Sequence, residues 1–103
     1  MHERFDRRAA SQTFQDLGFN RGTAEALAVK ADLLIAFDAA ARLRCTTQAV
    51  LSDLLGVTQP RVNSLLRGRL DLVSIDTLIE VLTKLDCVIR VETTPAGAGK
   101  LRG

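Results

Sequence analysis

The sequence predicts a mainly α fold of four to five helices with one short C-terminal β-strand. Three observations support this fold class. Apolar residues recur at helical spacing on both sides of residues 48–67. Within residues 48–67, two short segments have the same spacing and are separated by a glycine. Residues 88–93 alternate apolar and polar side chains, as a half-buried strand does. The 103 residues, 47% of them hydrophobic, suffice for one domain with an aliphatic core.

The chain divides into an arm, a domain and a tail. Residues 1–12 are polar, mixed in charge and without periodicity, so a flexible N-terminal arm is expected. The domain spans residues 13–94. Residues 95–103 begin with a proline and are rich in glycine, which predicts a flexible tail.

The first long helix is expected over residues 24–43, with Thr23 as its N-cap. Phe14, Leu17 and Phe19 form an apolar cluster before it, and this cluster is expected to dock onto the helix. The apolar residues of the helix cover about half of its circumference, more than one neighbouring layer covers. A second partner is therefore expected, either the cluster or another subunit. These apolar residues are Leu27, Ala31, Leu33, Leu34, Phe37 and Ala41.

Residues 47–68 have the spacing of a helix-turn-helix motif. Gly56 ends the first short helix, where the turn requires a left-handed backbone that glycine adopts without a Cβ clash. Ser52 is small enough for the two helices to approach closely at their crossing. A turn of this length with a glycine is typical of the motif. Aliphatic residues occupy the positions that must be buried, namely Leu51, Leu55, Val57, Val62 and Leu65.

Both motif helices have candidate caps at their first residues. Thr46 or Thr47 is predicted to cap the first helix through its hydroxyl oxygen, and Thr58 the second. Pro60 is tolerated in the first turn of the second helix because its missing N–H would have no intrahelical partner there. The second helix closes at Gly68.

A last helix and a strand complete the predicted domain. Ser74 is a credible N-cap, and Asp76 in the first turn favours the positive end of the helix dipole. In the strand at 88–93, Ile89 and Val91 share one face. Its backbone N–H and C=O groups need partners. These could come from residues 11–14, from packing on its own chain, or from the same strand of a second copy, which predicts a homodimer. The apolar positions of the last helix are Ile75, Leu78, Ile79, Leu82 and Leu85.

Positive charge is concentrated around the motif. The net charge is +2, but residues 42–69 hold five arginines against Asp53 alone, a local +4 that leaves −2 elsewhere. A basic patch confined to one region of a near-neutral protein predicts contact with phosphates. The chain has no tryptophan or tyrosine, so an aromatic platform for single strands or RNA is not expected. The five arginines are Arg42, Arg44, Arg61, Arg67 and Arg69.

Several function classes are not supported by composition. A single histidine and two distant cysteines give no zinc ligand set, so no metal or cofactor is expected, and Cys45 and Cys87 are interpreted as free thiols. The sequence has no carboxylate pair on a common face and no glycine-rich phosphate loop, so neither an enzyme nor a small-molecule substrate is expected. The N-terminus lacks a signal peptide, and the apolar run at 31–43 is too short to span a bilayer. A soluble cytoplasmic protein is expected.

The motif residues resemble those of a known family. With TQ at 47–48, LGVTQPRV at 55–62 and RG at 67–68, the chain is similar to the Xre family of Cro and lambda-repressor type proteins. The resemblance covers residues 33–85 and implies a lambda-repressor-like DNA-binding domain. The wider frame resembles HigA-type antitoxins, which are encoded beside a toxin of the HigB and RelE kind. That frame is DLGF at 16–19, ADLLIA at 31–36 and RGRLDLVSIDTL at 67–78.

The resemblance implies how individual residues would meet double-stranded DNA. Gln48, at the start of the first motif helix, would contact a phosphate together with the local backbone N–H groups. Gln59 would read a base edge in the major groove, most naturally adenine through N6 and N7. Asn63 and Ser64, one turn on, are the next candidates. Thr47 belongs to the same interface.

The remaining interface residues have other expected roles. Arg61 could fork onto guanine or take a phosphate, whereas Arg67 and Arg69 suit phosphate clamping. Pro60 stands where related proteins often carry a base-reading polar side chain, so only a van der Waals contact, such as one to a thymine methyl, is expected. Thr58 precedes these residues at the start of the same helix. Val50 replaces a glutamate that is frequent in the family, which predicts a protein contact there.

The leading expectation is a sequence-specific DNA-binding repressor that acts as a homodimer on a palindromic operator. Two recognition helices about 34 Å apart would then meet successive major grooves. The resemblance further implies the autoregulating antitoxin of a type II toxin–antitoxin pair, with residues 14–19, the arm or the long helix contacting the toxin. The alternatives are a stand-alone or phage-type regulator without a toxin, and an adaptor that binds only proteins.

Overall fold

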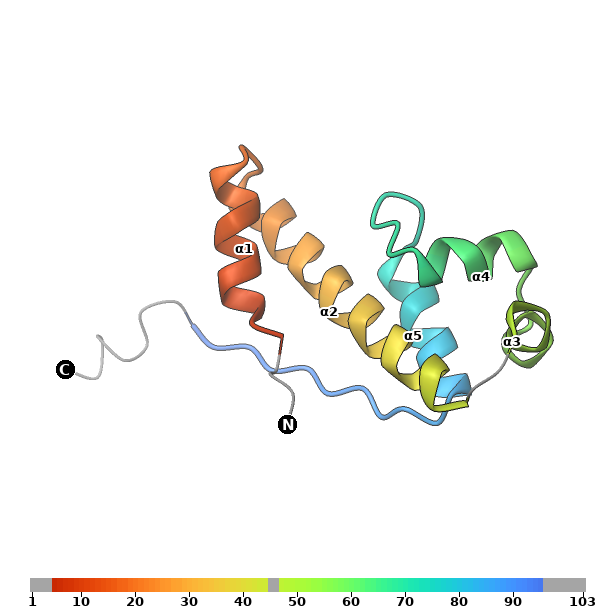
Figure 1. The fold of residues 1–103 in the computed structure, drawn as a ribbon. Coiled ribbons are helices and arrows are strands. Elements are labelled where there is room, and N and C mark those ends of the chain that lie inside the picture. The colour runs from red at the N-terminus through yellow and green to blue at the C-terminus, as the bar shows by residue number, and fades with distance from the viewer. Residues whose placement is uncertain (1–4, 45–46, 96–103) are drawn as a thin grey trace.

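The computed structural model describes residues 5–44 and 47–95, and within them it has five helices (Figure 1). The expected mainly α fold is therefore confirmed. The helices are α1 (Arg7–Asp16), α2 (Arg21–Arg44), α3 (Gln48–Leu55), α4 (Gln59–Leu66) and α5 (Ile75–Lys84).

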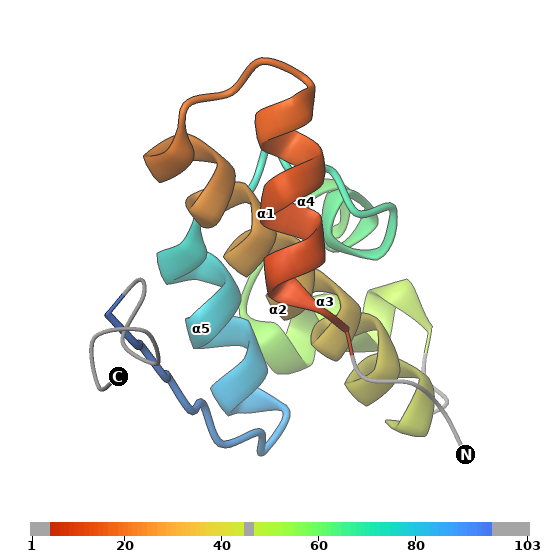
Figure 2. The same cartoon turned by 90° about the vertical axis from the view of Figure 1, so that its left-hand side faces the viewer.

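Helix α1 corrects the prediction of a flexible arm at residues 1–12. Residues 1–4 lie outside the described part, but residues 7–12 are helical. The Asp6 carboxylate caps this helix by accepting hydrogen bonds from the backbone N–H groups of Arg8, at 3.0 Å, and Ala9, at 3.1 Å. α1 lies beside the first half of α2 (Figures 1 and 2), and Ser11 on α1 is buried. A local cap and packing on a neighbouring helix thus stabilise a segment of low apolar content as a helix.

Helix α2 is the longest element and begins earlier than predicted. Its first turn is capped by Asn20, whose side-chain oxygen accepts the Thr23 backbone N–H at 2.8 Å, so the prediction of Thr23 as N-cap is wrong. Ala24 and Ala28, in the half beside α1, are fully buried. The other half packs against α4 and α5. The prediction of a second partner for this helix is therefore confirmed, and that partner is α1, which includes Phe14. Leu17 and Phe19, also expected to dock on the helix, are exposed instead.

Helix α5 closes the domain as the apolar spacing predicts. The Ser74 hydroxyl oxygen accepts the Thr77 backbone N–H at 3.1 Å, which confirms the predicted N-cap. The core joins α2 to α5 around a fully buried Phe37 on α2 and Leu78 on α5. The other core residues are Leu34, Ala41, Leu51, Leu55, Val62, Leu65, Val73, Val81, Leu82 and Leu85.

The prediction of a β-strand at residues 88–93 is wrong for this structure, because residues 5–44 and 47–95 contain no strand. After α5 the chain turns at Asp86, which has a left-handed backbone with φ of 65°. It then runs extended along the domain, back toward the start of α1 (Figure 1). Residues 11–14, one suggested pairing partner, lie in α1 and have no strand edge to offer. Ile89 packs against the core, whereas Val91 is exposed.

Candidate nucleic-acid interface

The start of α3 is formed by Thr47 and Gln48, and both side chains are exposed. The Thr47 hydroxyl oxygen accepts the backbone N–H of Val50 at 3.2 Å, which confirms it as the N-cap. Thr46, the alternative cap, lies outside the described residues. Because the remaining N–H groups of a first helical turn point outward along the axis, this end of α3 suits an anion such as a phosphate. The role of Gln48 in such a contact stays a prediction.

The turn between α3 and α4 is held by two hydrogen bonds. Gly56 has a left-handed backbone with φ of 68°, and its N–H donates to the Ser52 carbonyl at 2.9 Å. The Ser52 hydroxyl donates to the carbonyl of Val57. The prediction that Ser52 must be small at the helix crossing is thus extended, because its hydroxyl also bonds the backbone of the turn. These contacts fix how α4 leaves α3.

Helix α4 begins and ends as expected. The Thr58 hydroxyl oxygen accepts the Arg61 backbone N–H at 3.3 Å, and Pro60 lies in the first turn. The helix ends at Leu66, and Gly68 follows with φ of 67°. The hydroxyls of Thr47 and Thr58 are therefore engaged in capping, which leaves positioning of the two helices as the role that the geometry supports for these side chains.

Helix α4 has one buried and one exposed side. Val62 and Leu65 are fully buried, while Asn63 and Ser64 are half-buried on other faces of the helix. The predicted base-reading and phosphate-contacting residues of this segment therefore differ in their access to solvent. Four of these residues have exposed side chains, namely Gln59, Pro60, Arg61 and Arg67.

Fewer arginines are free of ion pairs in the structure than the charge count of residues 42–69 suggests. No carboxylate among the described residues lies within 4.0 Å of Arg61 or Arg67, so both guanidinium groups keep their charge directed to solvent. The other three arginines are in ion pairs: Arg42 with Asp38 at 2.8 Å, Arg44 with Asp86 at 3.0 Å, and Arg69 with Asp71 at 3.7 Å. Of the five arginines around the motif, the two without an ion pair in the described part of the chain are therefore those at the start and the end of α4, and Arg69 would have to exchange a carboxylate for a phosphate.

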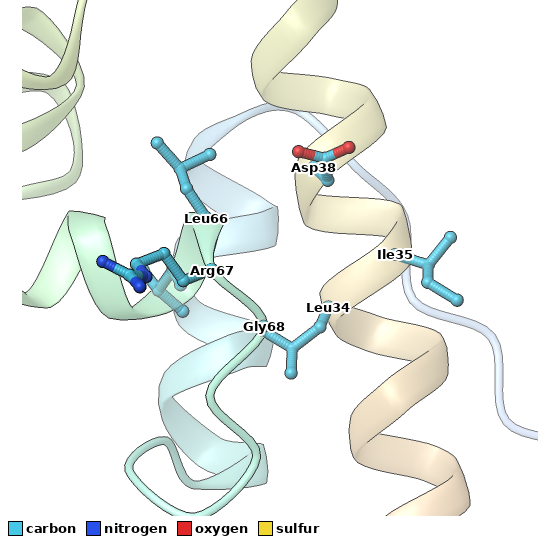
Figure 3. Close-up of a pocket in the computed structure, with 7 residues that line it drawn as sticks. Leu34, Ile35, Asp38, Leu66, Arg67 and Gly68 are labelled. Carbon is cyan, nitrogen blue, oxygen red and sulfur yellow. The ribbon is translucent and has the colours of Figure 1, made fainter.

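A hollow of about 250 Å³ lies between α2 and the C-terminal end of α4 (Figure 3). Figure 3 shows the Arg67 side chain leaving this hollow and pointing away from α2. Its exposed guanidinium is thus available to solvent at the end of α4. The lining residues are Leu34, Ile35, Asp38, Leu65, Leu66, Arg67 and Gly68.

Two lysines support the motif in a way that sequence reasoning missed. The Lys84 ammonium, at the end of α5, donates to the carbonyl of Leu55 at 2.8 Å, and the Lys30 ammonium on α2 donates to the carbonyl of Leu70, also at 2.8 Å. One bond joins the end of α3 to α5, and the other fixes the loop that follows α4. Neither lysine belongs to a spacing pattern, so no sequence signal indicated these contacts.

Two other kinds of feature are absent from the described residues. Residues 5–44 and 47–95 contain no group of three side chains that could hold a metal ion, and no helix among them has the length and apolar content needed to cross a membrane. Cys87 is a half-buried free thiol, as expected. Cys45, the other predicted free thiol, lies outside the described residues.

Comparison with known proteins places this geometry in a family. A family model described as a helix-turn-helix domain matches residues 13–93, which include α2 to α5 and most of the extended segment that follows. Comparison with curated proteins found no match. The match covers well over half of the chain and includes both helices of the motif. The chain therefore belongs to the helix-turn-helix domain family.

Proposed function

We propose that this protein is a sequence-specific transcriptional repressor that binds double-stranded DNA as a homodimer on a palindromic operator. The observation that carries the proposal is the two-sided character of α4. Val62 and Leu65 anchor the helix in the core, while Gln59 and Arg61 are exposed at its start and Arg67 at its end. Amide and guanidinium groups are suited to hydrogen bonding with base edges and phosphates.

The binding mode follows from the positions of these side chains along α4. Gln59 and Arg61 are in the first turn, the part of a recognition helix that reaches base edges in the major groove. Arg67, at the end of the helix, is placed for a phosphate of the flanking backbone. Gln48 and the start of α3 would contact the backbone on the other side. This arrangement predicts specificity at few base pairs for each protomer and a larger contribution from phosphate contacts.

Selection from a random duplex library is the direct test of this function. The proposal predicts enrichment of a two-fold symmetric site whose half-sites are about one helical turn apart. Repeating the selection with Gln59→Ala should relax the preference at one position in each half-site. Enrichment of no site by the wild-type protein would refute sequence-specific binding.

The proposed repressor is further taken to be the autoregulating antitoxin of a type II toxin–antitoxin pair, with a toxin of the HigB and RelE kind as partner. Support comes from an exposed apolar surface at the connection between α1 and α2. Leu17 is 71% exposed and Phe19 45% exposed, and the Phe14 and Phe19 rings pack edge to face with centroids 6.1 Å apart. Exposed large apolar side chains that cluster in this way are typical of protein contacts.

The position of this surface is compatible with binding DNA and a toxin at the same time. The α1–α2 connection and α3 lie at opposite ends of the molecule in Figure 1. Co-purification with the product of the adjacent reading frame tests the antitoxin role. Leu17→Ser should release that product while leaving duplex affinity unchanged. A neighbour that is not toxin-like and does not co-purify would favour a stand-alone or phage-type regulator.

A protein-only adaptor is the second candidate, and α3 provides the observation that favours it. Val50 is 53% exposed and Leu54 41% exposed, one turn apart on the same side of this helix. An adaptor would use this apolar side to bind a protein and would show no salt-dependent affinity for duplex DNA. The two candidates are therefore separated by the same DNA-binding measurements.

A further inference from the structure

The segment after α5 is extended, but its backbone is almost without partners. Among the described residues, the backbone of residues 88–94 has one hydrogen bond, in which the Arg7 guanidinium donates to the Glu92 carbonyl at 3.3 Å. Val88 is 82% exposed and Val91 is 77% exposed. An extended chain with β-branched side chains and free N–H and C=O groups is a template for pairing with another strand.

The segment is held in this extended form by the domain. At its start, α5 ends in a Schellman turn, in which Asp86 donates its N–H to the Thr83 carbonyl and Cys87 donates to the Leu82 carbonyl, both at 3.0 Å. The Arg44 guanidinium holds the Asp86 carboxylate at 3.0 Å. Ile89 then packs against the core. The strand edge is therefore prepared before any partner arrives, which reduces the entropy lost on pairing.

We propose that residues 88–94 pair antiparallel with the same residues of a second copy, with the two-fold axis beside Val91. The inference rests on the proposed homodimer and identifies its interface. A second copy is a fitting occupant because the charges of the segment are self-complementary in one register. Two paired strands packed against helices on one face also form a stable unit more readily than an isolated pair does.

The register follows from opposing side chains. Pairing centred on Val91 places Arg90 of each copy directly opposite Glu92 of the other, so two attractive pairs form across the axis. Pairing centred on Arg90 places the two Arg90 side chains opposite each other, and pairing centred on Glu92 does the same for the two Glu92 side chains, so like charges meet at the axis. Centring on Ile89 places Asp86 opposite Glu92. Of these four registers, only the one centred on Val91 pairs Arg90 with Glu92 on both sides of the axis.

The same register gives the exposed Val91 side chain an apolar neighbour. Successive side chains of a strand alternate between two faces, so Val91 and Thr93 are on the same face as Ile89, but of these three only Ile89 packs against the core. Ile89 is half-buried there, but Val91 is exposed. At the axis, the two Val91 side chains would lie side by side and shield each other from water.

Charge reversal with rescue tests the proposal. In sedimentation equilibrium at low salt, Arg90→Glu alone and Glu92→Arg alone should each weaken the dimer about tenfold, because each makes both cross-strand pairs repulsive. The double variant with both changes should return to within about threefold of the wild type. A dimer that is insensitive to the single reversals, or that the double variant does not restore, would overturn the register.

Cross-linking gives a second readout with a matched control. In a background with Cys45→Ala and Cys87→Ala, Val91→Cys should form an intermolecular disulfide on mild oxidation, because opposing Cα atoms are about 4.5–5.5 Å apart. Val88→Cys should not form this disulfide, because in the same register residue 88 of one copy lies opposite residue 94 of the other. The two introduced cysteines are then offset by six residues along the strands, about 20 Å. Equal cross-linking of both variants would refute the pairing.

The outcomes also separate this inference from the proposed function. A wild-type protein that is monomeric but binds duplex DNA with a steep salt dependence would overturn the strand pairing and leave DNA binding in place. A dimer that cross-links through Val91→Cys but has no duplex affinity would support the pairing and overturn the repressor.

Discussion

The Lys84 ammonium, in the last turn of α5, donates a 2.8 Å hydrogen bond to the carbonyl of Leu55, the last residue of α3. The carbonyl groups at the end of a helix have no intrahelical partner and carry the negative end of the helix dipole, so a cation there is stabilising. The next residue is Gly56, where the chain turns toward α4. Lys84 therefore links the core helix α5 to the point that sets the direction of α4.

Removing the Lys84 ammonium should destabilise the domain. Lys84→Met keeps the length of the side chain but loses the charged hydrogen bond, and we expect the free energy of unfolding to fall by about 1–2 kcal/mol in urea denaturation. Arg8→Met removes an exposed cation from α1 and should change it by less than about 0.5 kcal/mol. Equal effects of the two substitutions would mean that the Lys84 contact contributes nothing specific.

The turn at Gly56 should not tolerate a side chain. Gly56→Ala puts a Cβ on a left-handed backbone with φ of 68° and within 3.4 Å of the Lys84 Nζ atom, so a loss of about 1–2 kcal/mol in unfolding free energy is expected. Gly22→Ala is the matched control, because Gly22 lies in the first turn of α2 with an ordinary backbone, and a Cβ there would make only a van der Waals contact of 3.6 Å with Asn20 Oδ1. This variant should gain about 0.5–1 kcal/mol. If thermal denaturation shows the same shift for both, the left-handed turn is not what requires glycine.

Local chemistry made much of the motif predictable. Thr47, Thr58 and Ser74 cap their helices through bonds to a residue three positions later, and such bonds depend only on the nearby sequence. Gly56 is predictable for the same reason, since the backbone of the turn requires it. Most of the buried side chains of α4 and α5 follow from helical spacing, although Val81 is buried outside the predicted set.

The features that sequence reasoning missed depend on contacts far along the chain. The cap of α1, Asp6, is local, but the packing of α1 on α2, which buries Ser11, joins two separate helices. Lys84 meets Leu55 across 29 positions, which no local pattern encodes. The alternation at 88–93 correctly indicates an extended chain, but a strand also needs a partner, and the described residues of one copy supply none.

Base reading by Gln59 should appear as a loss of specificity. Gln59→Ala is expected to weaken binding to the selected duplex by about 1–3 kcal/mol, measured by fluorescence anisotropy, with much less effect on random-sequence DNA. Arg8→Ala, on α1, should alter neither affinity. An equal loss on the selected and random duplexes would show that Gln59 does not read a base.

Phosphate contact by Arg67 should appear in the salt dependence instead. Arg67→Ala is expected to weaken all duplexes alike and to reduce the slope of log affinity against log salt by about one unit for each protomer bound. Arg67→Lys should retain most of the slope, because a phosphate contact requires the charge more than the shape of the fork. An unchanged slope in Arg67→Ala would exclude Arg67 as a phosphate ligand.

Titration of duplex affinity against salt with the wild-type protein tests the central claim most directly. With several phosphate contacts from α3 and α4 of two protomers, log affinity should fall linearly with log salt, with a slope of about −0.9 for each contact. The selected duplex should stay about 10³-fold or more tighter than random DNA at physiological salt. An absence of duplex affinity at low salt, or an affinity that does not change with salt, would contradict the assignment of α4 as a DNA-reading helix.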